Sequence, residues 1–474
     1  MRGSAYAGEG SPLLWRVVTV PSLDPARWEA ELAGLFRGRP VIVVFKVLAA
    51  MTGDVAKLKR WGARKPLLIT RGVGAGRPPD PDAAEVLLLD VPTTDSMTDE
   101  IGAMARLAAD PPDEVVRRVE AYDPDREAVW WLPAHTDLTE LLGRPVLGGR
   151  PAAWGDLEDK TTCDALWDAA GVTRSESRIV AADDLGALRA ASEEVGGPNG
   201  TVWSGDASAG VNGSADCVRW VRSSHDAETV YEDLSPRCRR IRVMPYLDGV
   251  PCSIHGYVLD DGVAVFRPVE LVVLRSTAEG RFVFAGLSTW WDPPASVREQ
   301  MREVARSTGA LLADRVGYRG AFNVDGVSTR DGFRPTELNP RFTVALATLV
   351  PQLPMELLHA NVVAGHSAGI SAVNLERLVV ATADTDRRAY PLASCRHRLA
   401  DLVTARIREG MVLARPAVTS GSIVSFAPAD GVLRPGGRIA GLLAGVLRFA
   451  DRQWGCDFGE LSVPPDVHPH ATPG

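Results

Sequence analysis

The sequence predicts an α/β protein of three packed units: an N-terminal Rossmann-like domain with a parallel sheet, a middle domain, and a small C-terminal α+β module. The first observation is length, because 474 residues exceed what one ordinary domain holds. The second is the alternation of apolar strand-like and helical segments before residue 150. The third is a change of pattern near residues 150 and 385, which sets the expected boundaries at 1–150, 151–384 and 385–474.

Buried strands and covering helices alternate in the N-terminal domain, which favours a parallel sheet. The expected strands cover residues 39–45, 66–70, 85–90 and 127–132, and the expected helices cover residues 54–61 and 99–121. A glycine-rich stretch at 72–76 follows one strand, as a dinucleotide-binding loop would. The proline-rich residues after it cannot begin the helix that such a loop requires, so we interpret the stretch as a turn.

The middle domain is expected to carry a lid subdomain over about residues 172–255 and a hairpin near its end. Its expected helices are 159–170, 183–195 and 297–315, and its expected strands are 178–180, 201–203, 240–246, 252–259, 263–274, 318–327 and 333–339. The last two strands flank Asp331-Gly332, a dipeptide typical of tight hairpin turns. In the C-terminal module we expect a helix at 395–408 and strands at 410–415 and 422–426.

Composition limits the function classes. The formal net charge of −8 argues against a nucleic-acid partner, which needs a clustered basic face. The six cysteines are scattered without a CxxC pair, so a zinc knuckle or a disulfide framework is not expected. No apolar run reaches the roughly 20 residues of a membrane span, and the first ten residues lack an export pattern. We expect a cytoplasmic protein without a membrane partner.

Polar side chains gather on the expected hairpin. Side chains alternate between the two faces of a strand, so Asn323 and Asp325 share one face, while Glu337 and Asn339 share a face of the returning strand. With the turn near Asp331, Asp325 lies opposite Glu337. Facing carboxylates about 5 Å apart repel each other, so we expect a cation between them. Two carboxylates and an amide are a ligand set that suits Mg²⁺. The alternative is a hairpin whose acids are merely hydrated.

Two basic residues are expected to bind phosphate. Arg341 follows Asn339 by two positions and would project toward the same phosphates, which a guanidinium can bind with two donors. Only five of the 52 basic residues are lysine, and after Lys65 only Lys160 remains. A flexible ammonium where arginine is the rule suggests a role that a rigid guanidinium performs poorly. Chance survival of one lysine is the alternative.

The hairpin sequence resembles that of a known family. Glu337-Leu-Asn339-Pro340-Arg341, with an acid twelve positions earlier, is similar to the metal and phosphate hairpin of ATP-grasp carboxylate–amine ligases. The resemblance implies an ATP-grasp fold behind the N-terminal domain. It also implies that Asp325, Glu337 and Asn339 bind two magnesium ions, for which manganese can substitute. Arg341 would then contact the transferred phosphoryl group.

Further segments match the nucleotide site of this family. The helix after Lys160 ends in Ala-Gly171-Val, as in the family, where the lysine reaches ATP phosphates. The Gly/Ser-rich loop 204–214 resembles the lid over the β- and γ-phosphates, and the segment 243–249 resembles the hinge that meets adenine. The resemblance therefore implies nucleotide contacts by Lys160, Ser204, Ser208, Gly210, Met244, Tyr246 and Leu247.

The long N-terminal region, the Trp-Ser-Gly-Asp lid and the C-terminal appendage most resemble the peptide ligases of the pheganomycin type. That group joins an amino-acid-like carboxylate to the amino terminus of a peptide, in peptide antibiotic biosynthesis, and dimers are common in the wider family. The sequence departs from the family pattern in three places. The strand before the lid lacks a second lysine, Met244 replaces an acid, and Pro251 replaces a later acid.

The implied chemistry is attack of a carboxylate on ATP, followed by attack of an amine on the acyl phosphate. Arg341, Lys160 and Arg275 are the expected catalytic residues, because this chemistry needs charge neutralisation rather than a nucleophilic side chain. Arg267, Glu270 and Arg275 could hold a substrate carboxylate or guanidinium, or could be solvated edge charges. Two alternatives stay open for the whole protein: a phosphotransferase on the same scaffold, and a non-catalytic nucleotide-binding protein.

Overall fold

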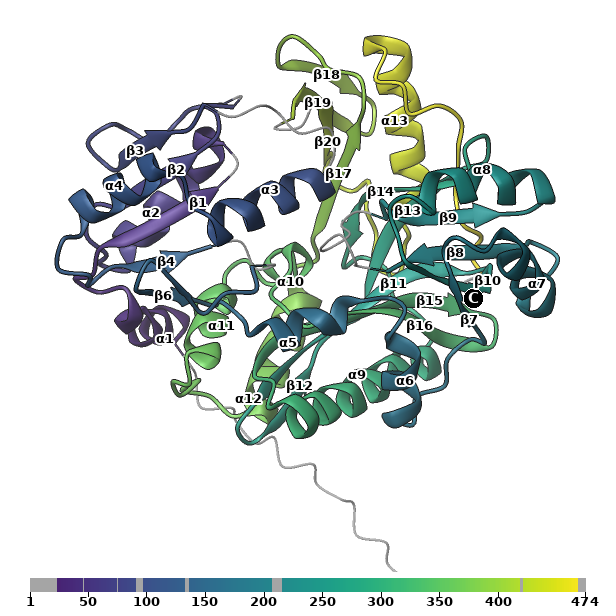
Figure 1. The fold of residues 1–474 in the computed structure, drawn as a ribbon, viewed down its shortest axis with the longest axis horizontal. Coiled ribbons are helices and arrows are strands. Elements are labelled where there is room, and N and C mark those ends of the chain that lie inside the picture. Colours follow the sequence, from purple (N-terminus) through teal and green to yellow (C-terminus); the bar gives the residue numbers. More distant parts are fainter. Residues whose placement is uncertain are drawn as a thin grey trace, which may run out of the picture.

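The computed structural model describes residues 24–45, 47–74, 76–90, 97–132, 136–206, 215–417 and 421–467. In this part of the chain a parallel sheet, a large antiparallel sheet and a C-terminal module pack together (Figure 1). The α/β class expected from the sequence is confirmed. None of the described helices is both long enough and apolar enough to span a bilayer.

The N-terminal sheet has the strand order β3-β2-β1-β4-β6-β5, and its pairs are parallel except for the edge pair β5–β6. Its strands are β1 (Val41–Phe45), β2 (Leu67–Thr70), β3 (Glu85–Leu88), β4 (Val129–Trp131), β5 (Glu140–Leu141) and β6 (Arg144–Leu147). Its helices are α1 (Pro25–Leu32), α2 (Thr52–Arg60), α3 (Met97–Ala109) and α4 (Asp113–Tyr122), with the 3₁₀ turns η1 (Ala33–Leu35) and η2 (Leu48–Met51). The inner strands are continuous apolar runs because both faces are covered.

The single helix expected at 99–121 is wrong in one respect. Two helices stand in its place, and Pro111 and Pro112 separate them. Proline has no N–H to donate and clashes with the preceding helical turn, so α3 ends before the prolines and α4 begins directly after them.

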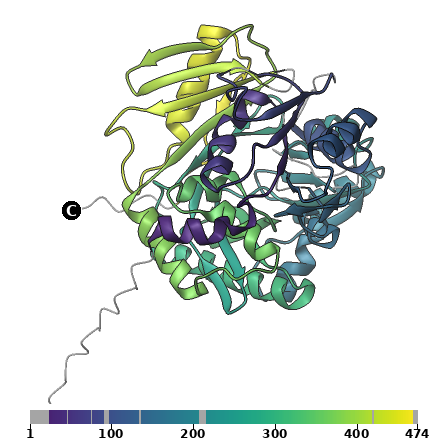
Figure 2. The same ribbon diagram turned by 90° about the vertical axis from the view of Figure 1, so that its left-hand side faces the viewer.

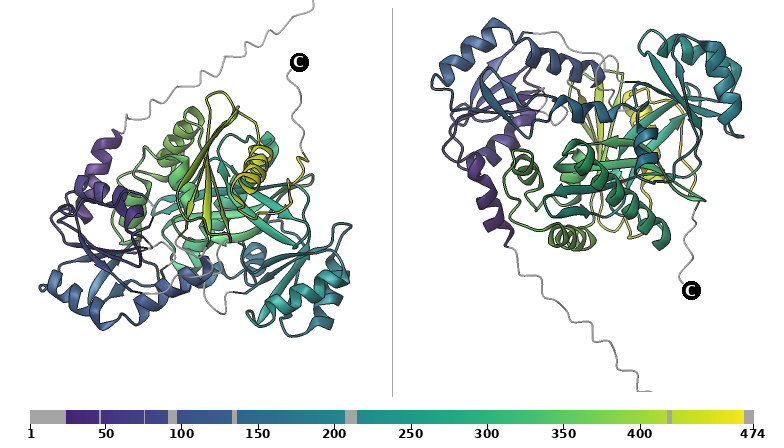
Figure 3. Two further views of the ribbon diagram at one scale, coloured as in Figure 1. Left: turned by 90° about the horizontal axis from the view of Figure 1, so that it is seen from above. Right: turned by 60° about the horizontal axis from the view of Figure 1, so that its bottom comes forward.

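Four further strands of the large antiparallel sheet form the region expected to be the lid subdomain. Its strands are β7 (Arg178–Ala181), β8 (Thr201–Gly205), β9 (Val218–Val221) and β10 (Arg240–Pro245), and its helices are α7 (Leu185–Val195) and α8 (Ser224–Leu234). Strand β10 lies between β7 and β8, and β9 meets β14 at one residue pair. Figure 3 shows these teal elements and the purple N-terminal elements on opposite sides of the central strands.

The central strands follow in the order β16-β15-β11-β13-β14. They are β11 (Val250–Leu259), β12 (Gly262–Val265), β13 (Val269–Ser276), β14 (Arg281–Ser288), β15 (Gly320–Thr329) and β16 (Gly332–Asn339). The accompanying helices are α5 (Ala152–Gly155), η3 (Asp156–Glu158), α6 (Cys163–Ala169), α9 (Ala295–Val316), α10 (Val344–Leu349), α11 (Met355–Val363) and α12 (Ala372–Thr385). The strand expected at 263–274 is divided into β12 and β13, because Pro268 interrupts it.

The C-terminal module extends the same sheet through β17 (Ala389–Cys395), which pairs with β14. It continues with β20 (Ser422–Pro428), β19 (Gly410–Pro416) and β18 (Val403–Ile407), and adds α13 (Ala440–Trp454) and β21 (Leu461–Ser462). The helix expected at 395–408 is wrong, since that range holds the end of β17 and the whole of β18 and none of its residues is helical. Figure 2 shows these yellow-green strands and α13 together at the top of the view.

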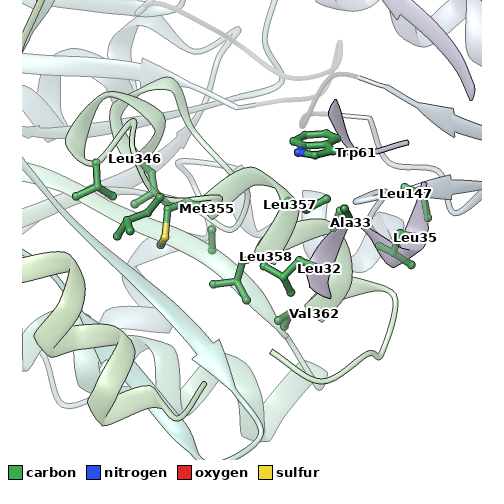
Figure 4. Packing of buried hydrophobic residues seen from close by; sticks show 14 of the residues in the cluster. Leu32, Ala33, Leu35, Trp61, Leu147, Leu346, Met355, Leu357, Leu358 and Val362 are labelled. Atoms are coloured by element: carbon green, nitrogen blue, oxygen red, sulfur yellow. The ribbon is translucent and has the colours of Figure 1, made fainter. Parts of the chain in front are cut away.

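One apolar cluster joins the N-terminal part to the central part. It contains Trp28, Leu32 and Phe36 from the N-terminal part, and Leu357 and Leu358 from α11. Figure 4 shows Leu32 near Leu357, Leu358 and Val362, and Leu35 near Leu147. On the other face of the central strands, α9 packs in a second cluster with β11 and β15. The hairpin β15–β16 therefore has one apolar face fixed by α9.

Candidate active site

The hairpin β15–β16 presents its polar face away from α9. The two strands are antiparallel, with Asp325 opposite Glu337 and Asn323 opposite Asn339, so the register expected from the sequence is confirmed. Amide groups surround the first carboxylate. The Nδ2 of Asn323 donates to Asp325 Oδ1 at 2.7 Å, and the Nδ2 of Asn339 donates to Asp325 Oδ2 at 3.2 Å. Oxygen atoms from two neighbouring strands thus converge on one spot.

The charges at this spot suit a hard cation. Burial, and then the charge of Glu337, raise the pKa of Asp325 to about 6, because two carboxylates close together disfavour a second negative charge. A divalent ion would remove that repulsion, and carboxylate and amide oxygens are the ligands that Mg²⁺ accepts. Within the described ranges no three His, Cys, Asp or Glu side chains group as a metal site. The fit therefore needs a third ligand, which the amide oxygen of Asn339 could supply; in this structure that oxygen accepts from Arg341 Nη2 at 2.9 Å.

Lys160 lies on the same polar face. It follows η3 and precedes α6, where Asp159 fixes the turn by accepting hydrogen bonds from the N–H and hydroxyl of Thr161 at 2.8 and 2.7 Å. The Nζ of Lys160 donates to Glu337 Oε1 at 2.9 Å. Burial opposes the charged form, but the charge and hydrogen bond of Glu337 outweigh it and raise the pKa of Lys160. The ammonium thus stays charged beside the carboxylates.

Arg341 stands two residues beyond the end of β16, and two side-chain contacts define its place. Its Nε donates to Glu158 Oε1 at 2.8 Å, and its Nη2 donates to Asn339 Oδ1 at 2.9 Å. Its side chain is 24% exposed. The structure therefore brings Asp325, Glu337, Asn339, Lys160 and Arg341 together, as the sequence predicted for one site.

The expected hinge residues lie beside the lid strand β8. Met244 is buried on β10 opposite Val202, and the N–H of Tyr246 donates to the carbonyl of Gly200 at 3.0 Å. The ring of Tyr246 stacks on Trp220 with centroids 4.7 Å apart. Leu247 is half-buried next to it. Their contact with a nucleotide remains a prediction.

The expected lid residues are only partly described. Ser204 is buried on β8, between Arg242 of β10 and Val218 of β9. Ser208 and Gly210 lie outside the described residues. The strand in which the sequence resemblance implies a second lysine, Thr201 to Ser204, contains none. The indole of Trp203 is buried and donates to Ser192 Oγ at 2.9 Å, so this side chain is part of the subdomain core.

The three residues expected to bind substrate lie in different surroundings. Arg267 forms ion pairs with Asp292 and Asp384. Glu270 accepts from Arg438 Nε at 3.0 Å and from the backbone N–H of Ile439 at 2.8 Å. Because Val269, not Glu270, shares the row of Ser253 and Asp325, Glu270 points to the opposite face of the sheet. The structure does not bring Glu270 to the carboxylate hairpin.

Arg275 lies near the hinge. Its Nη1 donates to the hydroxyl of Tyr246 at 2.7 Å, its Nη2 donates to the carbonyl of Val463 at 2.9 Å, and its guanidinium lies over the Trp220 ring. These contacts tie Tyr246 and Trp220 to the C-terminal segment. Roles in catalysis or substrate binding for Arg275, and in substrate binding for Arg267 and Glu270, remain predictions.

Sequence reasoning missed two charged residues behind the site, Glu158 and Arg150. Glu158 links both Arg341 and Arg150, whose Nη1 donates to it at 2.5 Å. Both side chains are buried. Glu158 stands two residues before Lys160, and a buried acid so close to the expected phosphate-binding lysine was the available signal. Its partner, 183 residues away, could not be identified from sequence.

No protein-family model matches the chain, and no curated protein matches it. Solved structures do. The biotin carboxylase domain of Hydrogenobacter thermophilus 2-oxoglutarate carboxylase, solved with MgADP and bicarbonate, is 13% identical with a TM-score of 0.54, over 90% of this chain and 91% of that one. An Aspergillus clavatus carboxyaminoimidazole ribonucleotide synthase solved with ATP is 14% identical with a TM-score of 0.51, over 90% and 99%. The chain has the ATP-grasp fold.

The ATP-grasp fold extends through almost the whole chain, since both matches cover nine-tenths of it. A match of this extent goes beyond the central strands alone. At 13–14% identity it shows how the chain is folded, and the side chains must be judged on their own geometry.

Proposed function

We propose that the protein is an ATP-dependent carboxylate–amine ligase that forms an amide bond through an acyl phosphate. The observation that carries the proposal is the meeting of Asp325, Glu337 and Asn339 with Lys160 and Arg341 on one face of an ATP-grasp hairpin. This set offers oxygen ligands for magnesium and two cations for phosphate. Phosphoryl transfer requires mainly positioning and charge neutralisation, which such a set can provide.

Each side chain has a role in this reaction. Asp325, Glu337 and Asn339 would hold magnesium, which, when bound, neutralises phosphate charge. Lys160 and Arg341 would bind the oxygens of the transferred phosphoryl group and keep it in line with the substrate carboxylate. The carboxylate oxygen attacks the terminal phosphorus and ADP leaves. An amine then attacks the acyl carbon, and its nitrogen loses a proton. The bond between the acyl carbon and the phosphate oxygen breaks, and phosphate leaves.

The finer proposal concerns the substrates. We infer an amino-acid-like acid and an amine that is the amino terminus of a peptide, as in the pheganomycin-type ligases, with a role in peptide antibiotic biosynthesis. Support comes from the sequence resemblance at the lid and in the terminal regions. Assembly as a homodimer and location in the cytoplasm belong to the same proposal.

Product analysis tests the reaction. Purified protein with ATP, Mg²⁺ and mixed amino acids and short peptides is expected to release ADP and phosphate and to form an amide that mass spectrometry detects. Release of AMP and pyrophosphate would refute the proposal. Hydroxylamine added in place of the amine should give a hydroxamate, because it captures an acyl phosphate. A phosphotransferase would instead leave a stable phosphate ester and no hydroxamate.

A single substitution separates an enzyme from a nucleotide-binding protein. Glu337→Gln removes one carboxylate charge from the hairpin while keeping its shape. We expect this variant to lose turnover by at least about a hundredfold, because a magnesium ligand would be lost. Asp331→Asn, in the exposed hairpin turn, is the matched control and should keep wild-type turnover. Unchanged ATP consumption in the Glu337 variant would contradict the proposed site.

A further inference from the structure

Glu158 is a buried carboxylate shared by two arginines. Its Oε1 accepts from Arg341 Nε at 2.8 Å and from Arg150 Nη1 at 2.5 Å. The side chain of Glu158 is 6% exposed and that of Arg150 is 3% exposed. Burial opposes the charged carboxylate, but Arg341 and Arg150 outweigh it and lower the pKa of Glu158. A charged acid therefore lies directly behind the arginine of the hairpin.

The contacts of Arg341 fix one edge of its guanidinium. Nε is held by Glu158 and Nη2 by Asn339. Among the described residues Nη1 has no hydrogen-bond acceptor, and the side chain is partly exposed. An arginine side chain without such contacts samples many rotamers, so two fixed donors leave the third group pointing in a defined direction.

Glu158 also belongs to a continuous polar chain. Arg150 Nε donates to Asp137 Oδ1 at 2.5 Å, and Arg150 Nη1 reaches the carbonyl of Pro340 at 3.3 Å. From Glu158 the chain passes through Arg341 to Asn339, and from Asn339 to Asp325 at 3.2 Å. The anchor at Asp137 lies before β5, in the N-terminal part of the molecule. The position of Arg341 thus depends on groups outside the hairpin.

The short segment from Glu158 to Lys160 positions both cations of the site, Lys160 and Arg341. Glu158 ends η3 and holds Arg341, and two residues later Lys160 reaches Glu337. The segment therefore crosses the end of β16 at two points. A fixed spacing between the ammonium of Lys160 and the guanidinium of Arg341 follows from this arrangement.

We propose that Glu158 is a positioning residue that aims the free Nη1 of Arg341 at the terminal phosphoryl group of the nucleotide. This inference rests on the proposed function, because it takes Arg341 to be the phosphate-binding arginine. Glu158 itself touches neither nucleotide nor substrate. Its removal should impair recognition of the terminal phosphate while leaving adenine recognition intact.

The first test measures nucleotide binding without turnover. We would compare the affinities for ADP and for AMP-PNP, both with Mg²⁺, by calorimetry. Wild type is expected to prefer AMP-PNP, and Glu158→Gln should reduce that preference by about tenfold, because a misaimed charged donor loses most of its advantage. If Glu158→Gln weakens the binding of ADP and AMP-PNP equally, or changes neither affinity, the inference is overturned.

Asp164→Asn is the matched control. Asp164 on α6 is 14% exposed, pairs with the buried Arg242 at 2.6 Å, and makes no hydrogen bond to Arg341. This variant should lower the melting temperature and keep the preference for AMP-PNP. If Glu158→Gln does not fold, Glu158→Asp, which keeps the charge but withdraws the carboxylate, gives the same comparison. If Asp164→Asn also loses the preference for AMP-PNP over ADP, the effect comes from a general loss of stability, and the inference is overturned.

The second test asks whether Glu158 acts through Arg341. In a double-mutant cycle, Glu158→Gln should lower kcat at least about tenfold in the wild-type background and less than about twofold when Arg341 is already alanine. If Glu158→Gln lowers kcat by the same factor whether or not Arg341 is present, the inference is overturned. Failure of the wild-type protein to form any acyl phosphate would instead overturn the proposed function, and the binding test would still decide the role of Glu158.

Discussion

Two buried histidines show how single residues in this fold are constrained. His255 on β11 lies opposite Asn323 of the hairpin and is 1% exposed. His359 on α11 accepts a hydrogen bond at Nδ1 from the backbone N–H of Ala321 at 3.1 Å. Burial lowers the pKa of both rings to about 3, so both are neutral at pH 7. Neither ring is therefore suited to proton transfer, in keeping with chemistry that needs no such group.

The neutral state of His359 predicts a pH effect on stability. Its pKa is about 3 in the folded protein and 6.5 in the unfolded chain, so only the unfolded chain takes up a proton between these values. The stability that His359 contributes is thus present above pH 6.5 and lost as the pH falls. Between pH 7 and pH 5 this loss is about 2 kcal/mol. His359→Gln has no ring to protonate, so its unfolding free energy should not show this loss. The difference in unfolding free energy between wild type and variant should therefore be smaller at pH 5 than at pH 7 by about 2 kcal/mol.

Chemical denaturation at pH 7 and pH 5 measures this gap. His225→Gln provides the control, because His225 is exposed on α8 and its ring stays in water in both states. A gap of equal size at the two pH values for the His359 variant would show that the folded protein accommodates the charged ring.

At the scale of elements, the sequence predicted the parts whose signals are local. The β15–β16 hairpin was predictable in register because a two-residue side-chain period and one Asp-Gly turn determine which residues face each other. The helix expected at 395–408 failed because β18 alternates half-buried and exposed side chains with a period of two and pairs with β19 across a short turn, a strand pattern that the helical interpretation overlooked. Strand β14 and the helices α10 to α13 were also not predicted from their residues.

In the site, too, the residues with local sequence signals were predicted and those joined by distant contacts were not. Asp325, Glu337, Asn339, Lys160 and Arg341 stand in short motifs, and the structure brings them together. The contacts of Glu158 and Arg150 join segments far apart in the chain, so sequence spacing could not reveal them. Charge and strand position alone did not reveal that Glu270 faces α13 rather than the hairpin.

The hairpin also predicts the effect of one methyl group. The register shifts between Asp325 and Gly326, and a Cβ at Gly326 would press against the carbonyl of Arg334 and the ring of Phe333. Gly326→Ala should therefore destabilise the protein by about 1–3 kcal/mol through overpacking and should weaken Mg²⁺ binding beside it. Gly445→Ala in α13 is the control, since a Cβ there meets nothing within 4 Å and should stabilise by up to about 1 kcal/mol. Similar melting temperatures for the two variants would contradict the steric argument.

At the scale of the whole molecule, one core serves both the N-terminal sheet and the central strands. The cluster on α11 includes Trp28 and Leu32 of α1 and Tyr257 of β11. Polar contacts reinforce it, because Asn361 Nδ2 donates to the carbonyl of Leu32 at 2.9 Å and Lys57 pairs with Glu356 at 3.0 Å. The part formed by β7 to β10, α7 and α8 has a separate core around Leu188 and Trp203. The N-terminal part and the central strands should therefore unfold together, while the core around Leu188 can open alone.

Truncation of one leucine in each core tests this coupling. Leu358 of α11 and Leu188 of α7 are both fully buried, so each change to alanine should cost about 2–5 kcal/mol. Leu358→Ala is expected to speed hydrogen exchange in α1 and β1 as well as in α11, because the shared cluster loses its centre. Leu188→Ala should speed exchange in α7, β8 and β10 and leave α1 and β1 protected. Mass spectrometry of peptides from these segments measures both, and protection of β1 that survives Leu358→Ala would mean that the N-terminal sheet is stable without α11.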